Sequence, residues 1–412
     1  MRKASLGTIF LTVFLDLLGF GLVVPYLPGV ARDHGASPFV ATLLGAVYSA
    51  MQFLFVPLWG HLSDRAGRRP ILLGSIAASA LGMVALGTVD SLAGLFVARA
   101  FVGIATANIA VASAYIADVT RPEERSRGMG TIGAAIGFGF VLGPVIGGVL
   151  QAHSPIARVG ALPAYAAAAL SILNFVLAAL FLPESLREQD RGKKVRSVSP
   201  IGARRFRAAV ARDGVGLAIL VHFVVVLSFS GLEQTFRLFT ADAFGLGTKE
   251  TGYILGVVGV VLIAVQGGLM RRLAPVVAER TLVRAGVLIE AAGFFAVAMS
   301  PVLLGGSAPL LVGGMATIAL GSGLVNPSLS ALVSRLGAAD GQGSLLGVLQ
   351  SAGALARVFG PAVGGLLYQS LGPRAPYGAA AIGMLIAAAA SLGLRKPEPR
   401  EDPPATPEVA GA

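Results

Sequence analysis

Apolar runs of about 20 residues recur along this chain of 412 residues, each bounded by charged or turn-forming residues. A helix rises about 1.5 Å per residue, so a run of this length matches the roughly 30 Å hydrocarbon core of a bilayer. We expect twelve such runs to cross a membrane as helices. Their ranges are 6–30, 40–60, 71–89, 92–116, 129–150, 161–182, 216–240, 251–270, 281–304, 308–334, 343–370 and 375–394.

The composition excludes an ordinary soluble protein. Hydrophobic residues make up 55% of the chain and charged residues 13%, whereas soluble domains carry about 25% charged residues. The chain has no Cys, and its four His are scattered without metal-ligand spacing. No Ser–His, HExxH or paired-Asp arrangement supports catalysis. We therefore expect no enzyme activity, no cofactor and no bound metal.

The basic residues indicate the orientation in the membrane. If the chain starts inside the cell, most of its 32 Lys and Arg fall in the amino terminus, the inner connections and the tail. This positive-inside bias predicts a cytoplasmic (inner) membrane protein with both termini in the cytoplasm. The net charge of +11 then reflects topology, and no nucleic-acid partner is expected. The exceptions are Arg32, Arg158, Lys249 and Arg374 outside, and Arg99, Arg237 and Arg357 within spans.

The largest polar connection divides the chain into two halves of six spans. We expect an N-terminal six-helix bundle over 1–182, a basic cytoplasmic linker over 183–215, a C-terminal six-helix bundle over 216–394 and a disordered cytoplasmic tail over 395–412. The 201–212 segment of the linker has the pattern of a helix that lies on anionic lipid, although a regulatory role is the alternative.

The two halves repeat each other. Gly143-Pro144-Val145-Ile146-Gly147-Gly148 returns as Gly360-Pro361-Ala362-Val363-Gly364-Gly365, at an offset of 217 (360 − 143). Gly103 and Asn108 match Gly321 and Asn326 at 218 (321 − 103), and Asp16 falls on Glu233 at 217 (233 − 16). This indicates a duplicated helical bundle. Secondary transporters have this architecture, with a substrate site near the bilayer midplane between the repeats.

Ionisable residues within the spans are the first candidates for chemistry, because a charge in hydrocarbon is costly. Asp16 has no base within its own helix, so it needs a partner from another span or a proton, and we expect it to couple transport to protons. Glu233 and Arg237 are spaced i, i+4 and either pair statically or take part in coupling. Glu290 either lines the cavity or forms a buried pair. The full set is Asp16, Glu233 and Glu290 with Arg99, Arg237 and Arg357.

Polar residues elsewhere in the spans form a second group of candidates. We expect them to line a substrate cavity, although amide side chains also bind helices together. The predicted cavity residues are Gln52, Asn108, Gln234, Arg237, Asn326, Gln350 and Arg357.

The repeated Gly-Pro motif has a direct physical consequence. Proline removes a helical hydrogen bond and glycine removes side-chain bulk, which gives a bend and a smooth face for close packing. We expect a gating hinge there, with static packing as the alternative. The residues are Gly139, Gly143, Pro144, Gly147 and Gly148 in span five, with Gly360, Pro361, Gly364 and Gly365 in span eleven.

The connection after span two crowds charges into a tight turn. Positive-inside anchoring explains its arginines but not an aspartate at a helix end beside glycine. We expect a cytoplasmic latch or gate built on Asp64 and Arg68. The charged and glycine positions of this turn are Gly60, Asp64, Arg65, Gly67, Arg68 and Arg69.

At these residues the sequence resembles the major facilitator superfamily. Residues 60–70 match its G-x-L-[ST]-D-R-x-G-R-R-P signature, Arg99 and Gly103 match R-x-x-x-G of helix four, and residues 139–148 match the helix-five pattern associated with antiporters. Leu15-Asp16 with Gly19, Gly21, Pro25 and Pro28 resembles helix one of twelve-helix drug/proton antiporters. Leu182-Pro183-Glu184-Ser185 matches the usual exit from helix six. The first half is similar to tetracycline/proton antiporters.

The resemblance implies roles for individual residues. Asp64 would pair near the cytoplasmic end of helix eleven, Arg68 would join a charge relay with Asp118 in the outward-facing state, and Arg99 would assist proton transfer near Asp16. The second-half connection, Arg271-Arg272-Leu273-Ala274-Pro275, lacks the Asp-Arg-x-Gly-Arg frame, so a latch is expected on one side alone.

Together these observations predict an all-α membrane protein with twelve transmembrane helices in two pseudo-symmetric six-helix bundles. We expect a monomeric carrier that exports a small amphipathic organic compound in exchange for protons by alternating access. A proton-coupled carrier of a sugar or organic acid is the first alternative. A membrane receptor or scaffold without transport activity is the second.

Overall fold

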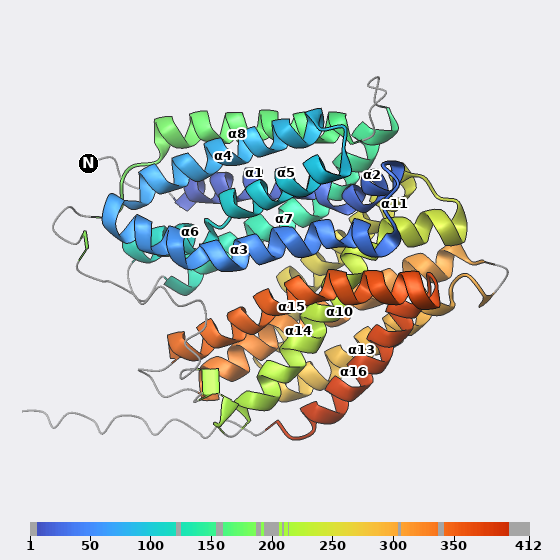
Figure 1. Cartoon of the computed structure of the whole chain (residues 1–412). Coiled ribbons are helices and arrows are strands. Elements are labelled where there is room, and N and C mark those ends of the chain that lie inside the picture. Colours follow the sequence, from blue (N-terminus) through green and yellow to red (C-terminus); the bar gives the residue numbers. More distant parts are fainter. Residues whose placement is uncertain are drawn as a thin grey trace, which may run out of the picture.

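The described part of the computed structural model consists mainly of helices (Figure 1). It describes residues 6–120, 125–153, 160–186, 191–192, 206–207, 210–212, 214–303, 306–336 and 342–394. The predicted tail and most of the predicted linker, including most of 201–212, lie outside the described residues. Ten of the described helical segments are long and apolar enough to cross a membrane, and two apolar helices, Gly137–Ala152 and Ala375–Ser391, are shorter. The twelve predicted spans and the all-α fold class are confirmed.

The N-terminal half contains the first six spans, and two of them are interrupted. The first span consists of α1, a 3-10 turn η1 and α2, and the fourth consists of α5 and α6. The elements are α1 (Leu6–Val23), η1 (Val24–Tyr26), α2 (Leu27–Asp33), α3 (Pro38–Ala66), α4 (Arg68–Thr88), α5 (Leu92–Ala105), α6 (Ile109–Val119), α7 (Arg125–Ala152) and α8 (Ala161–Phe181).

The C-terminal half contains the other six spans. Its second span is α11, a π-helical turn η4 and α12, and the other spans are single helices. The elements are α10 (Val215–Phe244), α11 (Thr248–Ala264), η4 (Val265–Leu269), α12 (Met270–Leu273), α13 (Glu279–Met299), α14 (Ala308–Leu336), α15 (Gln342–Leu371) and α16 (Ala375–Ser391).

Local sequence explains where several helices begin and end. The Ser37 and Ser91 side chains accept hydrogen bonds from the backbone N–H groups of Val40 and Gly94, which caps α3 and α5. Gly67 separates α3 from α4 with φ of 107°, a conformation that other residues rarely adopt. The sharp turn in the 60–70 connection therefore depends on this glycine.

Helix packing repeats between the halves. In the first half α1 packs on α7 and α8, α3 on α5, and α4 on α8. The corresponding helices of the second half pack in the same pairs: α10 on α15 and α16, α11 on α14, and α13 on α16. The same set of contacts in both halves agrees with the duplication read from the sequence.

The glycine contacts correct one of the predicted equivalences. A Cβ on Gly143 would lie 3.2 Å from the Leu18 carbonyl oxygen, and a Cβ on its repeat, Gly360, would lie 2.5 Å from the Leu227 carbonyl oxygen. Leu18 therefore corresponds to Leu227, at an offset of 209 (227 − 18). The match of Asp16 to Glu233 at 217 was wrong, because Leu227 and Gly360 are 133 residues apart (360 − 227), whereas Leu18 and Gly143 are 125 apart (143 − 18).

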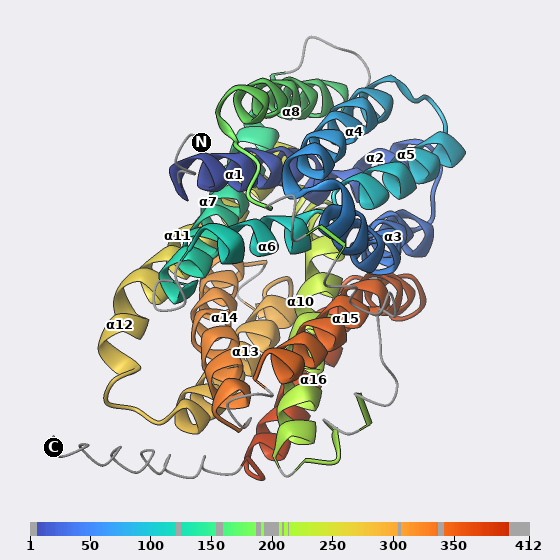
Figure 2. The same cartoon turned by 90° about the vertical axis from the view of Figure 1, so that its left-hand side faces the viewer.

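The two most extensive helix contacts between the halves are α7 with α11 and α3 with α15, and both use the repeated glycines (Figure 2). On α7, a Cβ added to Gly148 would lie 2.9 Å from the carbonyl oxygen of Thr248 and 3.3 Å from the Cα of Gly252 on α11. On α15, a Cβ added to Gly365 would lie 3.1 Å from the Cα of Phe39 on α3. The absence of side chains lets the backbones of the two halves approach closely.

The two ends of the bundle differ in how the halves meet. We call the end with the 60–70 connection the Arg68 end and the opposite end the Arg32 end. Arg32 donates to both carboxylate oxygens of Asp242, at 2.7 and 2.8 Å, and so joins the halves at the Arg32 end. Among the described residues, the ion pairs at the Arg68 end stay within one half: Arg68 with Asp64 and Asp118, and Arg335 with Glu279.

The glycine contact predicts a position-dependent effect of one methyl group. Gly148→Ala should lower Tm, because its Cβ would meet the Thr248 backbone at 2.9 Å and overpacking costs about 1–3 kcal/mol. Gly137→Ala on the same helix meets open space and should be neutral or stabilising by up to about 1 kcal/mol. Thermal unfolding of the detergent-purified protein checks this, and equal Tm values for the two variants would contradict it.

Candidate functional site

Charged side chains from both halves meet around one aromatic residue. Tyr48 of α3 lies within electrostatic reach of Arg99 on α5, Asp16 on α1 and Glu233 on α10. Arg357 on α15 lies within electrostatic reach of Glu233 and of Tyr48. We call these five residues the Tyr48 cluster. Five helices contribute one residue each, so the cluster exists only where the two halves come together.

Arg99 is the most deeply buried member of the cluster. Its side chain is 1% exposed, and its guanidinium carbon lies 4.3 Å from the centre of the Tyr48 ring, a cation–π contact. Its Nε donates to the Leu44 carbonyl at 3.4 Å. Among the described residues Nη1 has no hydrogen-bond partner. Arg99 therefore has a donor available for an acidic group.

The fourth span is broken beside the Tyr48 cluster. Helix α5 ends at Ala105 and α6 begins at Ile109, which leaves backbone carbonyls without helical partners. Gln52 donates to the Thr106 carbonyl at 3.3 Å, and Trp59 donates to the Ile104 carbonyl at 2.6 Å. The predicted cavity residue Gln52 thus satisfies backbone at the break, and α3 supplies both donors.

Asp16 faces this break. It is half-buried, and its carboxylate meets the Asn108 side chain at the start of α6. Asn108 also donates to the Ser75 hydroxyl of α4 at 2.5 Å. Asn108 therefore lies beside Asp16, the predicted coupling residue, because the break between α5 and α6 places it there.

Glu233 faces the other helices rather than its neighbour on α10. It lies within electrostatic reach of Arg357 and Arg99, whereas Arg237 donates to the Leu246 carbonyl at 3.2 Å near the Arg32 end. No ion pair within 4.0 Å joins Glu233 to Arg237 in the described part of the chain. Of the two predicted arrangements, the i, i+4 pair does not form.

Gln350 and Arg357 lie on one exposed face of α15. Both are exposed and are seven residues apart, which places them on one side of the helix. The exposed apolar side chains of Phe359, Val363 and Leu366 lie on the opposite side, where lipid is expected. Arg357 and Gln350 therefore lie on the side of α15 away from these apolar side chains, and their role in a substrate cavity stays a prediction.

The remaining predicted cavity residues lie in helix contacts. Gln234 is 4% exposed, and a Cβ on Gly45 of α3 would lie 2.6 Å from its Oε1, so it packs between the halves. Asn326 donates to the Ser322 carbonyl of its own helix at 3.2 Å. Neither is a member of the Tyr48 cluster.

Glu290 lies apart from the Tyr48 cluster. It is 1% exposed between α13 and α14 and accepts a hydrogen bond from the Ser322 hydroxyl at 2.5 Å. Its Oε2 has no partner among the described residues. The surrounding backbone is tight, because a Cβ on Gly321 would lie 2.5 Å from the Glu290 Cγ.

Arg68 is the centre of a second charged group, at the Arg68 end. It pairs with Asp64 at 2.6 Å and with Asp118 at 3.2 Å, and it donates to the Ser63 hydroxyl at 2.6 Å. The resemblance associated the Arg68–Asp118 pair with an outward-facing state. Here the pair forms while the halves are in contact at the Arg32 end, and Asp64 pairs with Arg68 rather than with helix eleven.

Two residues with contacts at these sites, Glu184 and Tyr48, were not predicted from the sequence. Glu184 accepts from the backbone N–H groups of Arg68 at 2.9 Å and Arg69 at 3.2 Å, so it caps α4 from the end of the sixth span. The Leu-Pro-Glu-Ser motif was the signal for Glu184. Tyr48 gave no signal, because a tyrosine within an apolar run is ordinary in a membrane helix.

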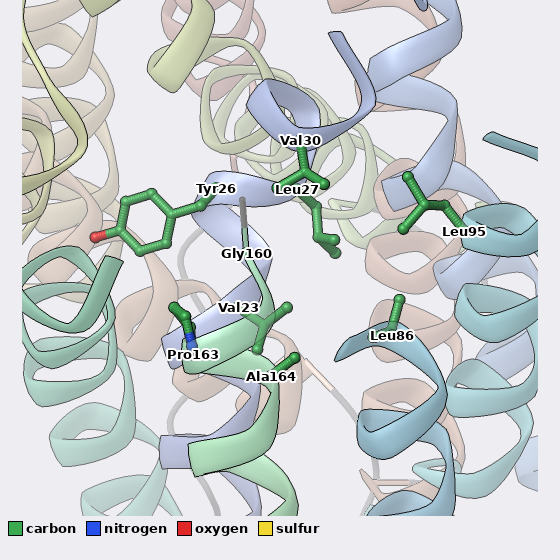
Figure 3. A pocket seen from close by; sticks show the side chains of 9 residues that line it. All are labelled: Val23, Tyr26, Leu27, Val30, Leu86, Leu95, Gly160, Pro163 and Ala164. Carbon is green, nitrogen blue, oxygen red and sulfur yellow. The ribbon is translucent and has the colours of Figure 1, made fainter. Parts of the chain in front are cut away.

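One cavity lies near the Arg32 end, and it has no room for an organic solute (Figure 3). It holds about 10 Å³, room for roughly one water molecule. Leu27, Val30 and Leu95 are among its apolar lining residues, and the Tyr26 hydroxyl points away from it. This cavity lies within the N-terminal half and does not touch the Tyr48 cluster.

Solved structures of transporters have the same arrangement of helices. The crystal structure of the human organic anion transporter MFSD10 (TETRAN) matches with a TM-score of 0.71 at 27% identity, over 94% of this chain and 98% of that one. The nucleoside transporter NupG matches with a TM-score of 0.75 at 14% identity, over 95% of this chain and 100% of that one. The second likeness shows the fold alone.

Sequence comparisons give the family. The chain is 34% identical over 361 residues to the tetracycline resistance protein, class C, of Escherichia coli, covering 87% of this chain and 88% of that protein. It is 30% identical over 422 residues to Homo sapiens major facilitator superfamily domain-containing protein 10, covering 91% and 89%. The model of the Major Facilitator Superfamily matches residues 9–361 and 277–411. The chain therefore belongs to the major facilitator superfamily.

Proposed function

We propose that this transporter exports a small amphipathic organic compound across the cytoplasmic membrane in exchange for protons. The Tyr48 cluster carries the proposal, because it gathers two carboxylates and two guanidinium groups from both halves. Asp16 is the proposed protonation site, and Glu233 and Arg99 are its partners. The carrier acts as a monomer and needs no cofactor.

Alternating access follows from the way the halves touch. With both termini in the cytoplasm, the Arg32 end is the outer end, so the Arg32–Asp242 pair closes the outside. Gln350 and Arg357 are then reached from the cytoplasm. The Arg68 group with Asp118 is the proposed cytoplasmic gate, and the repeated Gly-Pro faces are the proposed hinge on which the halves rock.

Competition at one carboxylate supplies the coupling. A carboxylate that binds a proton loses the charge that holds a basic partner or a cationic substrate, so proton binding and substrate binding exclude each other. The tetracycline resistance protein of Escherichia coli, 34% identical, supports a drug-like compound as the substrate.

One observation favours the alternative substrate class, an organic acid. Arg357 is exposed between the halves and makes no hydrogen bond among the described residues, and a relative is named as an organic anion transporter. An efflux panel of cationic and anionic compounds, with and without a protonophore, decides between the two classes. Proton-linked efflux of cationic amphiphiles is the expected result.

Asp16→Asn should abolish transport driven by a pH gradient, because the amide keeps the shape of the carboxylate but takes up no proton. In proteoliposomes with an imposed gradient, uphill uptake should fall by at least about tenfold. The control Glu279→Gln removes a carboxylate that pairs with Arg335 at the Arg68 end and should retain the uphill flux. Unchanged uphill transport by Asp16→Asn would reject Asp16 as the coupling group.

Glu290 is a second proposed protonation site, and Glu290→Gln tests it. The amide oxygen still accepts from Ser322, so the α13–α14 contact should persist and Tm should change by less than for Glu290→Leu. The pH profile of transport should shift in Glu290→Gln. A profile that superimposes on that of the wild type would remove Glu290 from the coupling groups.

The closed outer end predicts a charge-dependent change in accessibility. Arg32→Asp places two acids together and should open the outside, whereas Arg32→Asp combined with Asp242→Arg should close it again. The chain has no native Cys, so Gln350→Cys can be labelled directly with an impermeant maleimide from the cytoplasmic side of inverted vesicles. Labelling should fall about two- to fivefold in the single variant, since an exposed pair contributes about 1 kcal/mol or less.

Arg335→Glu is the matched control for this experiment. It breaks the pair with Glu279, which lies within one half, and it should leave the labelling unchanged. Failure of the exchanged pair to restore the wild-type rate would show that the Arg32–Asp242 pair does not hold the outer end closed.

A further inference from the structure

Tyr48 is the residue on which the charges of both halves converge. It is 7% exposed and lies within electrostatic reach of Arg99, Asp16 and Glu233. Its ring and its hydroxyl have different partners. The ring faces Arg99, and the hydroxyl reaches Thr106 and Gln52 at the break in the fourth span.

The ring holds Arg99 without using its N–H donors. A cation–π contact attracts the guanidinium to the ring face, 4.3 Å away. Nε donates to the Leu44 carbonyl, whereas Nη1 has no hydrogen-bond partner among the described residues. The contact with the ring therefore leaves Nη1 as a donor for a carboxylate.

The hydroxyl is fixed to the helix break by a directed set of hydrogen bonds. The Thr106 hydroxyl lies 2.9 Å from the Val102 carbonyl and 2.8 Å from the Tyr48 hydroxyl. Thr106 has one hydroxyl proton. When that proton goes to the Val102 carbonyl, Tyr48 donates to Thr106, and Gln52 donates to the Tyr48 oxygen at 3.2 Å. The orientation of Tyr48 therefore follows the position of the break.

We propose that Tyr48 is a positioning residue for proton coupling. Its ring holds the Arg99 guanidinium through the cation–π contact, and its hydroxyl holds the ring in place through the hydrogen bond to Thr106 at the break between α5 and α6. This inference rests on the proposed function. Arg99 lies on α5 and Thr106 caps the C-terminal end of α5, so a movement of α5 relative to α3 acts on both contacts of Tyr48. Arg99 then changes its distance from Glu233 and Asp16, so a movement of the fourth span changes the proton affinity of the site.

Two substitutions at Tyr48 separate the two contacts. Tyr48→Phe keeps the ring and removes the hydroxyl, and Tyr48→Leu removes both. Tyr48→Phe should retain gradient-driven transport at a reduced rate. Tyr48→Leu should lose gradient-driven transport to the level of Arg99→Ala and shift the pH profile of substrate exchange, while exchange at equal pH persists.

Phe20→Leu is the matched control, because the Phe20 ring packs on Tyr48 with centroids 5.2 Å apart. It removes a similar aromatic contact on the same residue and should leave the pH profile unchanged. A pH profile unaltered in Tyr48→Leu would overturn the proposal. So would an equal shift in Phe20→Leu, because the effect would then be one of packing.

A double-mutant cycle tests the contact between Tyr48 and Arg99 without any transport measurement. If Tyr48 acts through Arg99, the Tm decreases of Tyr48→Leu and Arg99→Ala should not add in the double variant. Additive Tm decreases would show that Tyr48 does not act by holding Arg99, even if transport changed. If the wild-type protein shows no proton-linked flux, the proposed function fails, and the cycle still decides whether Tyr48 holds Arg99.

Discussion

Ionised side chains are costly inside a bilayer, and the rest of this structure depends on how that cost is reduced. Asp16, Arg99, Glu233 and Arg357 each stand on a different helix, and none has an oppositely charged neighbour one turn away with which it pairs. They lie around Tyr48, where the two halves meet. Moving the halves apart changes the environment of these charges, so the bundle geometry and the state of the carboxylates are linked.

Helix α3 connects the parts of the molecule that must move together. Its Gly45 packs on Gln234 of the second half, and Tyr48 seats Arg99. Gln52 and Trp59 satisfy the carbonyls exposed by the break between α5 and α6. Its far end carries Asp64, which pairs with Arg68. A backbone carbonyl left unsatisfied within the membrane costs several kcal/mol, so the donors of α3 stabilise the break.

The two halves share their packing but not their chemistry. Equivalent helices pack in the same pairs, and the repeated glycines make the same kinds of close contact. The charged groups differ. Glu290 lies in the contact between α13 and α14. The second half has no counterpart to the Arg68 group among its described residues, because Arg271 and Arg272 are exposed. Duplication thus preserved the apolar surfaces that form the bundle, while the polar residues diverged.

The sequence by itself determined the twelve spans, the duplication and the 60–70 turn, because these depend on apolar length, on repeated glycines and on Gly67 within a short segment. It also identified Asp16, Arg99, Glu233 and Arg357, since any charge within an apolar run stands out. It missed Tyr48 and gave Asp16 and Glu233 a false equivalence. Only the tertiary structure decided which charges meet, that Glu290 lies apart, and that Glu233 faces Arg357 rather than Arg237. These contacts join residues far apart in the chain, and their geometry depends on how the two halves dock.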